Sequence, residues 1–147
     1  MWALATRGAL ACEILYFWAL SGTVLALFMP DVGVSFPDVR CVSFFALHGA
    51  VVVSAVVLVF GTGRAPRPGA DVRVFAITCA YAAVVACIDL LCTENFLYLR
   101  MKPSQPSILD WMGPWPWYIL ASAALAFVLF RGLMAPFRSL AAERPRP

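Results

Sequence analysis

The sequence predicts an all-α membrane protein, built as a bundle of four transmembrane helices with both termini in the cytoplasm. Of its 147 residues, 63% are hydrophobic and 13% are charged, whereas soluble domains are about 45–50% apolar and about 25% charged. The apolar residues gather in four stretches, and most Lys and Arg residues lie on one side of them. So low a charged fraction excludes both a soluble domain of this size and an intrinsically disordered chain.

Each apolar stretch has the length of a spanning helix, which needs roughly 20 mostly apolar residues. The first ends at Pro30-Asp31, and the fourth ends at Ala135-Pro136. The first is not a cleaved signal peptide, because its apolar run is too long and contains Glu13. We therefore expect one helical domain over residues 1–147, with a flexible tail at 136–147 and spans at about 9–29, 41–60, 72–92 and 115–134.

The distribution of basic residues predicts the orientation of these helices. If the N-terminus is inside, the outer side holds only Arg40, Arg100 and Lys102. The inner side then holds the other eight basic residues, which are Arg7, Arg64, Arg67, Arg73, Arg131, Arg138, Arg144 and Arg146. An excess of Lys and Arg marks the cytoplasmic side. We therefore expect a multi-pass protein of the cell membrane with both ends in the cytoplasm.

The longest connection covers residues 93–114 on the outer side and is rich in aromatic and charged residues. Loops of this length without a helix are usually functional or disordered, and this one is too aromatic for disorder. Trp111, Trp115 and Trp117 also fit an interfacial aromatic belt that anchors the fourth helix. Both readings of the three tryptophans stay open at this point.

Motifs for metal, cofactor and nucleic-acid chemistry are missing from the sequence. It has no C-x-x-C pair, phosphate-binding loop or dinucleotide-binding fingerprint, so we expect no metal and no cofactor. The scattered basic residues do not form a nucleic-acid patch. One disulfide remains open among the cysteines nearest the ends of the apolar runs, which are Cys41, Cys87 and Cys92.

One histidine and two carboxylates lie within the predicted spans, where ionisable residues are rare and costly. His48 is the only histidine and lies seven residues into the second span. It is either a proton-transfer group or a neutral histidine that makes one hydrogen bond to another helix. Asp89 lies at similar depth and either supports His48 or reaches interfacial water. Glu13 lies near the inner side and is expected to pair with Arg7 or Arg73.

Three stretches together resemble the YwaF-type integral membrane proteins of bacteria, over about residues 10–129. They are residues 13–23 (EILYFWALSGT), residues 30–49 with the elements PD, FP and FFALHG, and residues 95–118 with NFLYL, KP, SILD and GPWPWY. The combination of the FFALHG and GPWPWY elements is specific, whereas either alone is weak.

The resemblance implies a function in lipid chemistry. Eukaryotic relatives of the YwaF family resemble membrane-embedded acyltransferases that act on lysophospholipids, so membrane lipids are the implied partners. His48 matches the family's histidine and would act as the general base of acyl transfer. The resemblance places the outer loop over a lipid headgroup, with Asp89 as a supporting residue and with substrate-binding roles for Asn95, Tyr98, Lys102 and Asp110.

The chain departs from that family at the nucleophile, which lies on helices upstream of the matched segment. We therefore expect the C-terminal part of a larger bundle, completed by missing N-terminal helices or by self-association. Of the cysteines present, only Cys87 and Cys92 are expected to approach His48. The alternative function is a non-catalytic membrane protein, such as an accessory subunit or a small transporter component.

Overall fold

The computed structural model describes residues 8–142, and every regular element in this part of the chain is a helix. Four of its helices are long and apolar enough to cross a membrane, as the sequence predicts. They are Ala9–Phe28, Val39–Gly61, Ala70–Cys92 and Trp117–Arg138. The predicted fold class, an all-α protein with four membrane-spanning helices, is therefore confirmed. The predicted pairing of Glu13 with Arg7 falls partly outside the described residues.

The first two spans each contain a π-helical segment. The first is divided into α2 (Ala9–Trp18), the π-helix η1 (Ala19–Thr23) and α3 (Val24–Phe28). The second consists of α4 (Val39–Val56), which Asp38 caps through the backbone N–H of Arg40, and the π-helix η2 (Val57–Gly61). π-Helical turns are rare and frequently lie at functional sites, which makes η1, in the middle of its span, a segment of interest.

The third span is one uninterrupted helix, α5 (Ala70–Cys92), with left-handed residues at both ends. Gly69, at φ +75°, turns the chain into the helix, and Thr93, at φ +57°, turns it out. The outer loop, which we define as residues 93–116, then contains two short 3-10 helices, η3 (Phe96–Tyr98) and η4 (Ile108–Met112). It leads into α6 (Trp117–Ala142).

The end of α6 corrects the sequence analysis, which stops the fourth helix at Met134 and makes residues 136–147 a flexible tail. The helix instead continues through Pro136 to Ala142, while residues 143–147 lie outside the described part. Proline removes a helical hydrogen bond, but tertiary contacts support the helix on both sides of Pro136. Tyr16 Oη donates to the carbonyl of Leu133 at 3.1 Å, and Arg138 pairs with Asp71.

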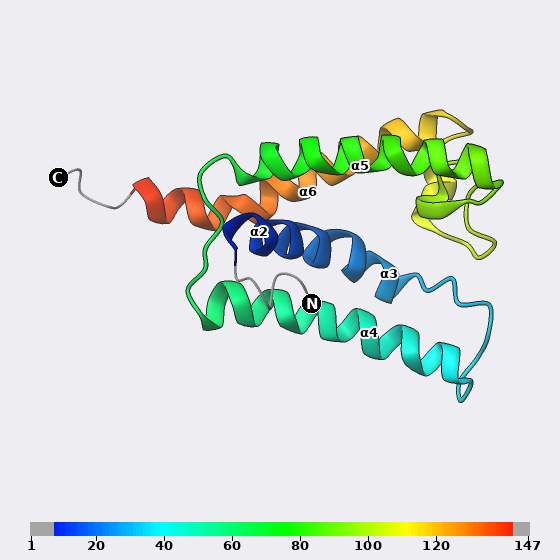
Figure 1. The fold of residues 1–147 in the computed structure, drawn as a ribbon, viewed down its shortest axis with the longest axis horizontal. Coiled ribbons are helices and arrows are strands. Elements are labelled where there is room, and N and C mark those ends of the chain that lie inside the picture. Colours follow the sequence, from blue (N-terminus) through cyan, green and yellow to red (C-terminus); the bar gives the residue numbers. More distant parts are fainter. Residues whose placement is uncertain (1–7, 143–147) are drawn as a thin grey trace.

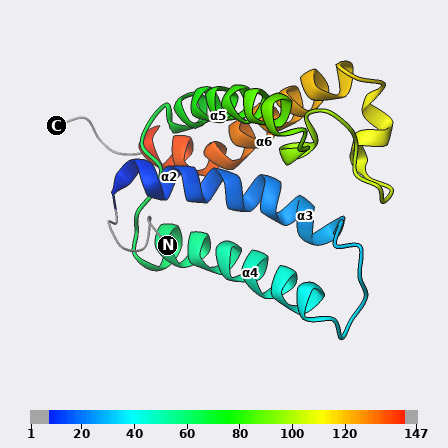
Figure 2. The same ribbon diagram turned by 45° about the vertical axis from the view of Figure 1, so that its right-hand side comes forward.

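The four spans are arranged with α2 and α3 in the middle (Figures 1 and 2). On one side they pack against α4. On the other side α2 contacts α5, η1 contacts α6, and α5 and α6 pack along each other. The segment α2–α3 therefore lies between α4 and α5, and this order decides which of the predicted residues can meet.

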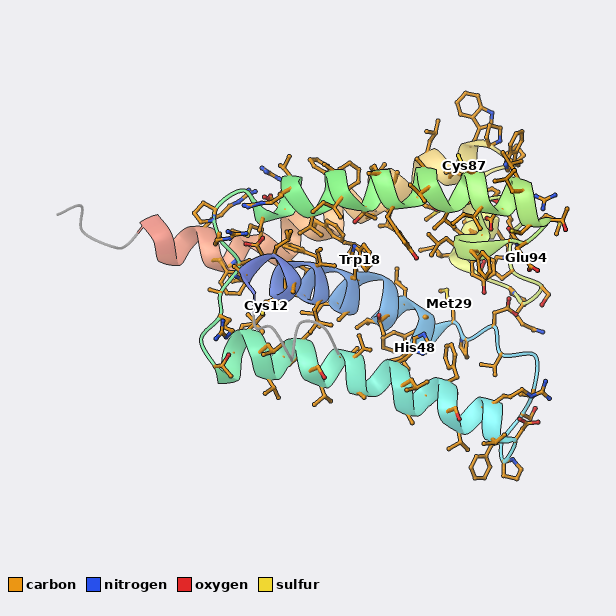
Figure 3. All side chains as sticks on the ribbon, viewed as in Figure 1. Cys12, Trp18, Met29, His48, Cys87 and Glu94 are labelled. Carbon is orange, nitrogen blue, oxygen red and sulfur yellow. The ribbon has the colours of Figure 1, made fainter. Side chains whose placement is uncertain are left out.

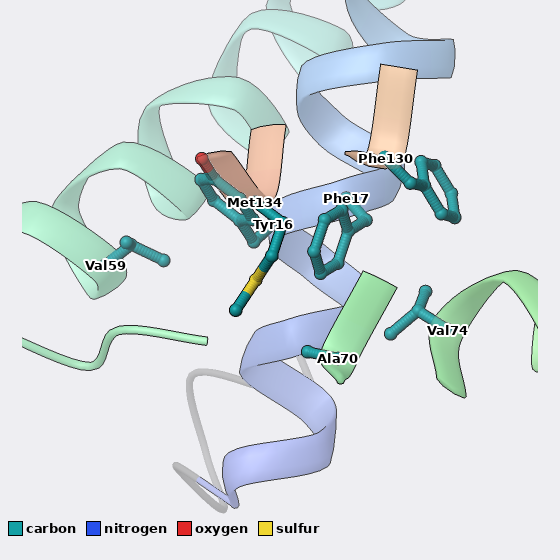
Figure 4. Packing of buried hydrophobic residues seen from close by; sticks show 7 residues of the cluster. All are labelled: Tyr16, Phe17, Val59, Ala70, Val74, Phe130 and Met134. Carbon is teal, nitrogen blue, oxygen red and sulfur yellow. The ribbon is translucent and has the colours of Figure 1, made fainter. Parts of the chain in front are cut away.

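A cluster of seven buried hydrophobic residues lies at the end of the bundle where α2 and α5 begin. Phe17 contacts Phe130 with ring centroids 5.0 Å apart, and Tyr16 packs edge-on against Phe137. Figure 4 shows how α2, α5, α6 and the end of the second span contribute to this cluster, whose buried members are Tyr16, Phe17, Val59, Ala70, Val74, Phe130 and Met134. The outer loop, at the opposite end of the bundle, contributes no residue to this cluster.

Candidate functional site

The outer half of the bundle contains a cavity of about 470 Å³. The first span forms one wall, α5 and α6 form the others, and the two short helices of the outer loop cover its outer end. The surface that its lining residues present to the cavity is mostly apolar. The lining residues are Trp18, Ser21, Gly22, Thr23, Leu25, Thr78, Tyr81, Leu97, Tyr98, Ile108, Leu109, Met112, Ser122, Leu125, Ala126, Leu129 and Phe130. We call this cavity the outer pocket.

The inner end of the outer pocket is closed by contacts between the first span and α5. Trp18 lies between α2 and α5 (Figure 3), where its indole N–H donates to Thr78 Oγ1 at 2.8 Å. Its ring also packs on Tyr81, with centroids 5.4 Å apart. Phe130, which is 1% exposed, lies at this buried end. The indole bond and the ring pair hold α2 against α5 at this depth.

The π-helix η1 supplies the wall of the pocket opposite α5. Three of its five residues, Ser21, Gly22 and Thr23, line the cavity. A π-turn inserts one extra residue into the helix and widens it locally. Beyond η1, α3 packs against α4, and the outer pocket occupies the space on its α5 side.

The outer loop is held over the pocket by hydrogen bonds from buried and half-buried side chains. Asp89 Oδ1 accepts the backbone N–H of Phe96 at 2.9 Å, and Asn95 Oδ1 accepts those of Arg100 and Met101 at 3.0 and 3.1 Å. Tyr118 Oη donates to the carbonyl of Tyr98 at 2.6 Å. These bonds fix η3, whose Leu97 and Tyr98 line the cavity.

A second set of bonds joins the outer loop to the connection between α3 and α4. Tyr98 Oη donates to Asp31 Oδ2, and Ser104 Oγ donates to Asp31 Oδ1, both at 3.1 Å. Burial, and the hydrogen bond to Asp31, raise the pKa of Tyr98 above its ordinary value. Leu97 and Tyr98 both have positive φ angles, of 57° and 56°. Such conformations are unfavourable for residues other than glycine and persist only where surrounding contacts hold them.

His48 does not reach the outer pocket. It lies on the side of α4 that faces α3 (Figure 3), half-buried, with its ring stacked on Phe44 at 4.0 Å. Its Nδ1 lies 2.8 Å from the carbonyl of Phe44. Because a carbonyl can only accept, Nδ1 carries the hydrogen in this contact. This contact lies within α4, so it is not the inter-helix hydrogen bond of the neutral alternative.

Asp89 and the two cysteines of α5 are not brought to His48, because α2 and α3 lie between α4 and α5. Asp89 is fully buried and supports the outer loop; its Oδ2 has no hydrogen-bond partner among the described residues. Cys87 and Cys92 are exposed, and all five cysteines are free thiols. Among the described residues, no hydrogen bond or ion pair joins His48 to Asp89, Cys87 or Cys92.

The four predicted substrate-binding residues divide into two groups. Asn95 and Asp110 maintain the loop itself, since Asp110 Oδ2 accepts the backbone N–H of Ser107 at the start of η4. Tyr98 lines the outer pocket. Lys102 is not among the lining residues; its Nζ lies 3.9 Å from Asp110 Oδ1 and 5.6 Å from the centre of the Tyr118 ring.

Two buried carboxylates at the inner end form ion pairs that sequence reasoning missed in part. Glu13 pairs with Arg67 at 2.7 Å and lies 3.9 Å from Arg73, so the predicted Arg73 contact exists beside a closer one. Asp71, in the first turn of α5, is fully buried and pairs with Arg131 and Arg138. In the sequence, Asp71 stands among basic residues at the start of the third span, which indicates an ion pair. Its partners, however, lie on α6 and could not be chosen from the sequence.

The fold and the pocket define a multi-pass helical membrane protein with a cavity in one half of its bundle. The sequence pattern of the TMEM164 family matches residues 1–134, and the chain belongs to that family. This corrects the resemblance to YwaF-type proteins, because the family found by the comparison is a different one. Neither the curated proteins nor the solved structures contain a match to this chain.

Proposed function

We propose that this protein binds a membrane lipid and holds one hydrocarbon chain of it in the outer pocket. The single observation that carries the proposal is the cavity of about 470 Å³ between the first span, α5 and α6. Its size falls within the range of ligand pockets, about 300–1,000 Å³, which are mostly apolar with a few polar groups. A cavity with this lining, inside the hydrocarbon layer, is suited to an alkyl chain.

The exposure of the lining residues indicates how a lipid reaches the pocket. Tyr81 on α5 is 47% exposed and Leu97 in η3 is 54% exposed, although both line the cavity. Gly22, on the opposite wall, is also exposed. The cavity therefore opens sideways between the first span and α5, toward the surrounding lipid, and a chain enters from the bilayer without crossing the outer loop.

The outer loop supplies a cation for the headgroup in this proposal. Lys102 is partly buried between Asp110 and the Tyr118 ring, and an ammonium group binds lipid phosphate as a point charge. Lys102 belongs to the loop whose helices η3 and η4 line the pocket, which supports a phospholipid with its headgroup at the outer interface. Asn95 and Asp110 contribute through the shape of the loop.

Binding is proposed here in place of acyl transfer by His48. A general base must lie within hydrogen-bond reach of the proton it removes, about 2.6–3.2 Å, or act through one water. His48 lies on α4, which contributes no residue to the outer pocket, and its Nδ1 contacts the carbonyl of Phe44. The geometry thus supports a pocket that holds a lipid, with His48 outside it.

Photo-crosslinking tests the proposal directly. The protein is placed in lipid nanodiscs that contain phosphatidylcholine with a diazirine on one acyl chain, and the crosslinked residues are mapped by mass spectrometry. Phe130 and Ser21 are the diagnostic positions, because they line the pocket but are 1% and 7% exposed. Labelling at both is expected, whereas labelling confined to exposed residues would contradict lipid binding in the pocket.

A pair of glycine variants provides the matched control. Gly22 lines the pocket and Gly132 on α6 does not, and a Cβ added at either glycine meets no atom within 4 Å. Gly22→Leu therefore places a bulky side chain in the cavity without an immediate clash, and Gly132→Leu adds the same group outside it. Labelling at Phe130 should fall severalfold in the first variant and stay unchanged in the second.

A further inference from the structure

Six hydroxyl-bearing side chains line the outer pocket, and four of them already donate a hydrogen bond within the protein. Ser21, Thr78 and Ser122 each donate to the carbonyl four residues earlier, at 2.6, 2.8 and 2.7 Å. Tyr98 donates to Asp31. Thr23 and Tyr81 line the same cavity, and in the described part of the chain neither makes a hydrogen bond.

The two unpaired hydroxyls lie well inside the hydrocarbon layer. Thr23 comes five residues before Phe28, the last residue of α3, which is about 7 Å at 1.5 Å per residue. Tyr81 comes eleven residues before Cys92, the last residue of α5, which is about 16 Å. Water is scarce at these depths, so an unpaired polar group is unfavourable there. A hydrogen-bond partner from a bound molecule would remove that penalty.

The position of the Tyr81 hydroxyl is set by other contacts, which makes it a prepared donor. The Tyr81 ring packs on Trp18, whose own N–H is held by Thr78. Thr23 belongs to the π-helix that shapes the opposite wall. Donors held in place before binding lose little conformational entropy when a ligand arrives.

We propose that the unpaired hydroxyls of Thr23 and Tyr81, at two depths of the pocket, each offer a hydrogen bond to oxygen carried on the hydrocarbon part of the lipid, so that the pocket selects an oxygenated chain, hydroxylated or oxo-substituted, over a saturated one. The proposal rests on the proposed function, because it assigns two polar contacts within the same pocket. In the proposed function the headgroup belongs at the level of Lys102. Both hydroxyls lie deeper in the membrane, which argues against the headgroup as their partner. The shared chemistry is an alkyl chain with one mid-chain oxygen, present either as a free fatty acid or as an acyl chain of a phospholipid.

Competition against the photoreactive phosphatidylcholine tests this selection. The competitors are stearate, 10-hydroxystearate and 10-oxostearate, each added as the free acid and, in a second arm, as the acyl chain of a phosphatidylcholine. The readout is labelling at Phe130. The wild-type protein should bind each oxygenated chain about tenfold more tightly than the saturated chain, as expected for one or two net hydrogen bonds. The arm with the stronger competition identifies the source of the chain.

The variant Thr23→Val/Tyr81→Phe removes only the two hydroxyl groups and keeps the shape of the wall. In this variant the three competitors should become equal within about twofold, and labelling by the photoreactive lipid should persist. The competitors differ in how strongly they partition into the nanodisc lipid. These differences are the same for the wild-type protein and the variant, so they cancel when the two are compared. Equal competition in the wild-type protein, or a preference that survives in the variant, would overturn the oxygen site and leave lipid binding intact. Absence of labelling at Phe130 in the wild-type protein would instead overturn the proposed function.

Discussion

The carboxylate of Glu13 is held by Arg67 from three directions. The guanidinium donates from Nε to Oε1 at 2.7 Å and from Nη2 to Oε2 at 3.0 Å, and the backbone N–H of Arg67 donates to Oε1 at 3.1 Å. The Glu13 side chain is 2% exposed and that of Arg67 is 52% exposed. The pair fastens the connection between α4 and α5 to the first span, with the carboxylate inside and the cation at the surface.

This asymmetry predicts unequal effects of removing either partner. Arg67→Ala leaves a buried carboxylate with only Arg73 nearby, so the free energy of unfolding should fall by more than it does in Glu13→Gln. The half-exposed arginine places the loss below that of a fully buried pair. Glu13→Gln leaves Arg67 free to reach water, so the free energy of unfolding should fall by only about 1 kcal/mol. Denaturant unfolding in detergent micelles measures both.

The double variant Glu13→Gln/Arg67→Ala provides the control. It should be more stable than Arg67→Ala alone, because the unpaired buried charge has been removed. Equal losses for the two single variants would show that the buried carboxylate is not the dominant factor.

Asp71 should contribute more to the docking of α6 than either of its arginine partners. It is fully buried and contacts both Arg131 and Arg138. When one arginine is removed, the other still pairs with Asp71. Asp71→Asn should lower the free energy of unfolding by about 2–3 kcal/mol, discounted for the half-exposed cations. Arg131→Ala and Arg138→Ala should each lower it by about 1 kcal/mol. Limited proteolysis after Met134, compared among the three variants, would show whether the last turns of α6 detach; equal cleavage in all three is the opposing result.

The bond between Tyr98 and Asp31 predicts a loss of stability at alkaline pH. The pKa of Tyr98 is raised in the folded protein, so its hydroxyl keeps the proton longer there than in the unfolded chain. The contribution to stability is complete below the ordinary tyrosine pKa of about 10, and it is lost as the pH rises through the raised value. Thermal unfolding at pH 8–11 should show a steeper alkaline decline for the wild-type protein than for Tyr98→Phe. Identical declines would remove Tyr98 as the titrating group.

The orientation of the bundle can be tested by cysteine labelling in intact cells. In a background with the five native cysteines replaced by Ser, Gln105→Cys in the outer loop should react with an impermeant maleimide. Pro66→Cys, in the basic connection between α4 and α5, should react only after the cells are opened. The reverse pattern would place both termini outside the cytoplasm.

Much of the membrane topology was determined by the sequence alone. The four spans could be predicted from local composition, because a chain in hydrocarbon satisfies its own backbone hydrogen bonds only as a helix, and about 20 apolar residues suffice for each crossing. The one boundary that local rules misplaced is the end of α6 at Pro136, where Tyr16 and Asp71 support the helix from other elements.

The site depended on the order of the helices in space, which only the tertiary structure decided. His48 and Asp89 lie at similar predicted depths, yet α2 and α3 separate their helices. Residues with no mark in the sequence, such as Thr23 and Tyr81, instead meet at one cavity. Lipid removes the hydrophobic driving force between helices, so their neighbours are chosen by side-chain shape and by hydrogen bonds or ion pairs over long separations, as with Glu13 and Arg67, 54 positions apart. Hydropathy records how deep a residue lies in the membrane and contains no information on which helix it faces.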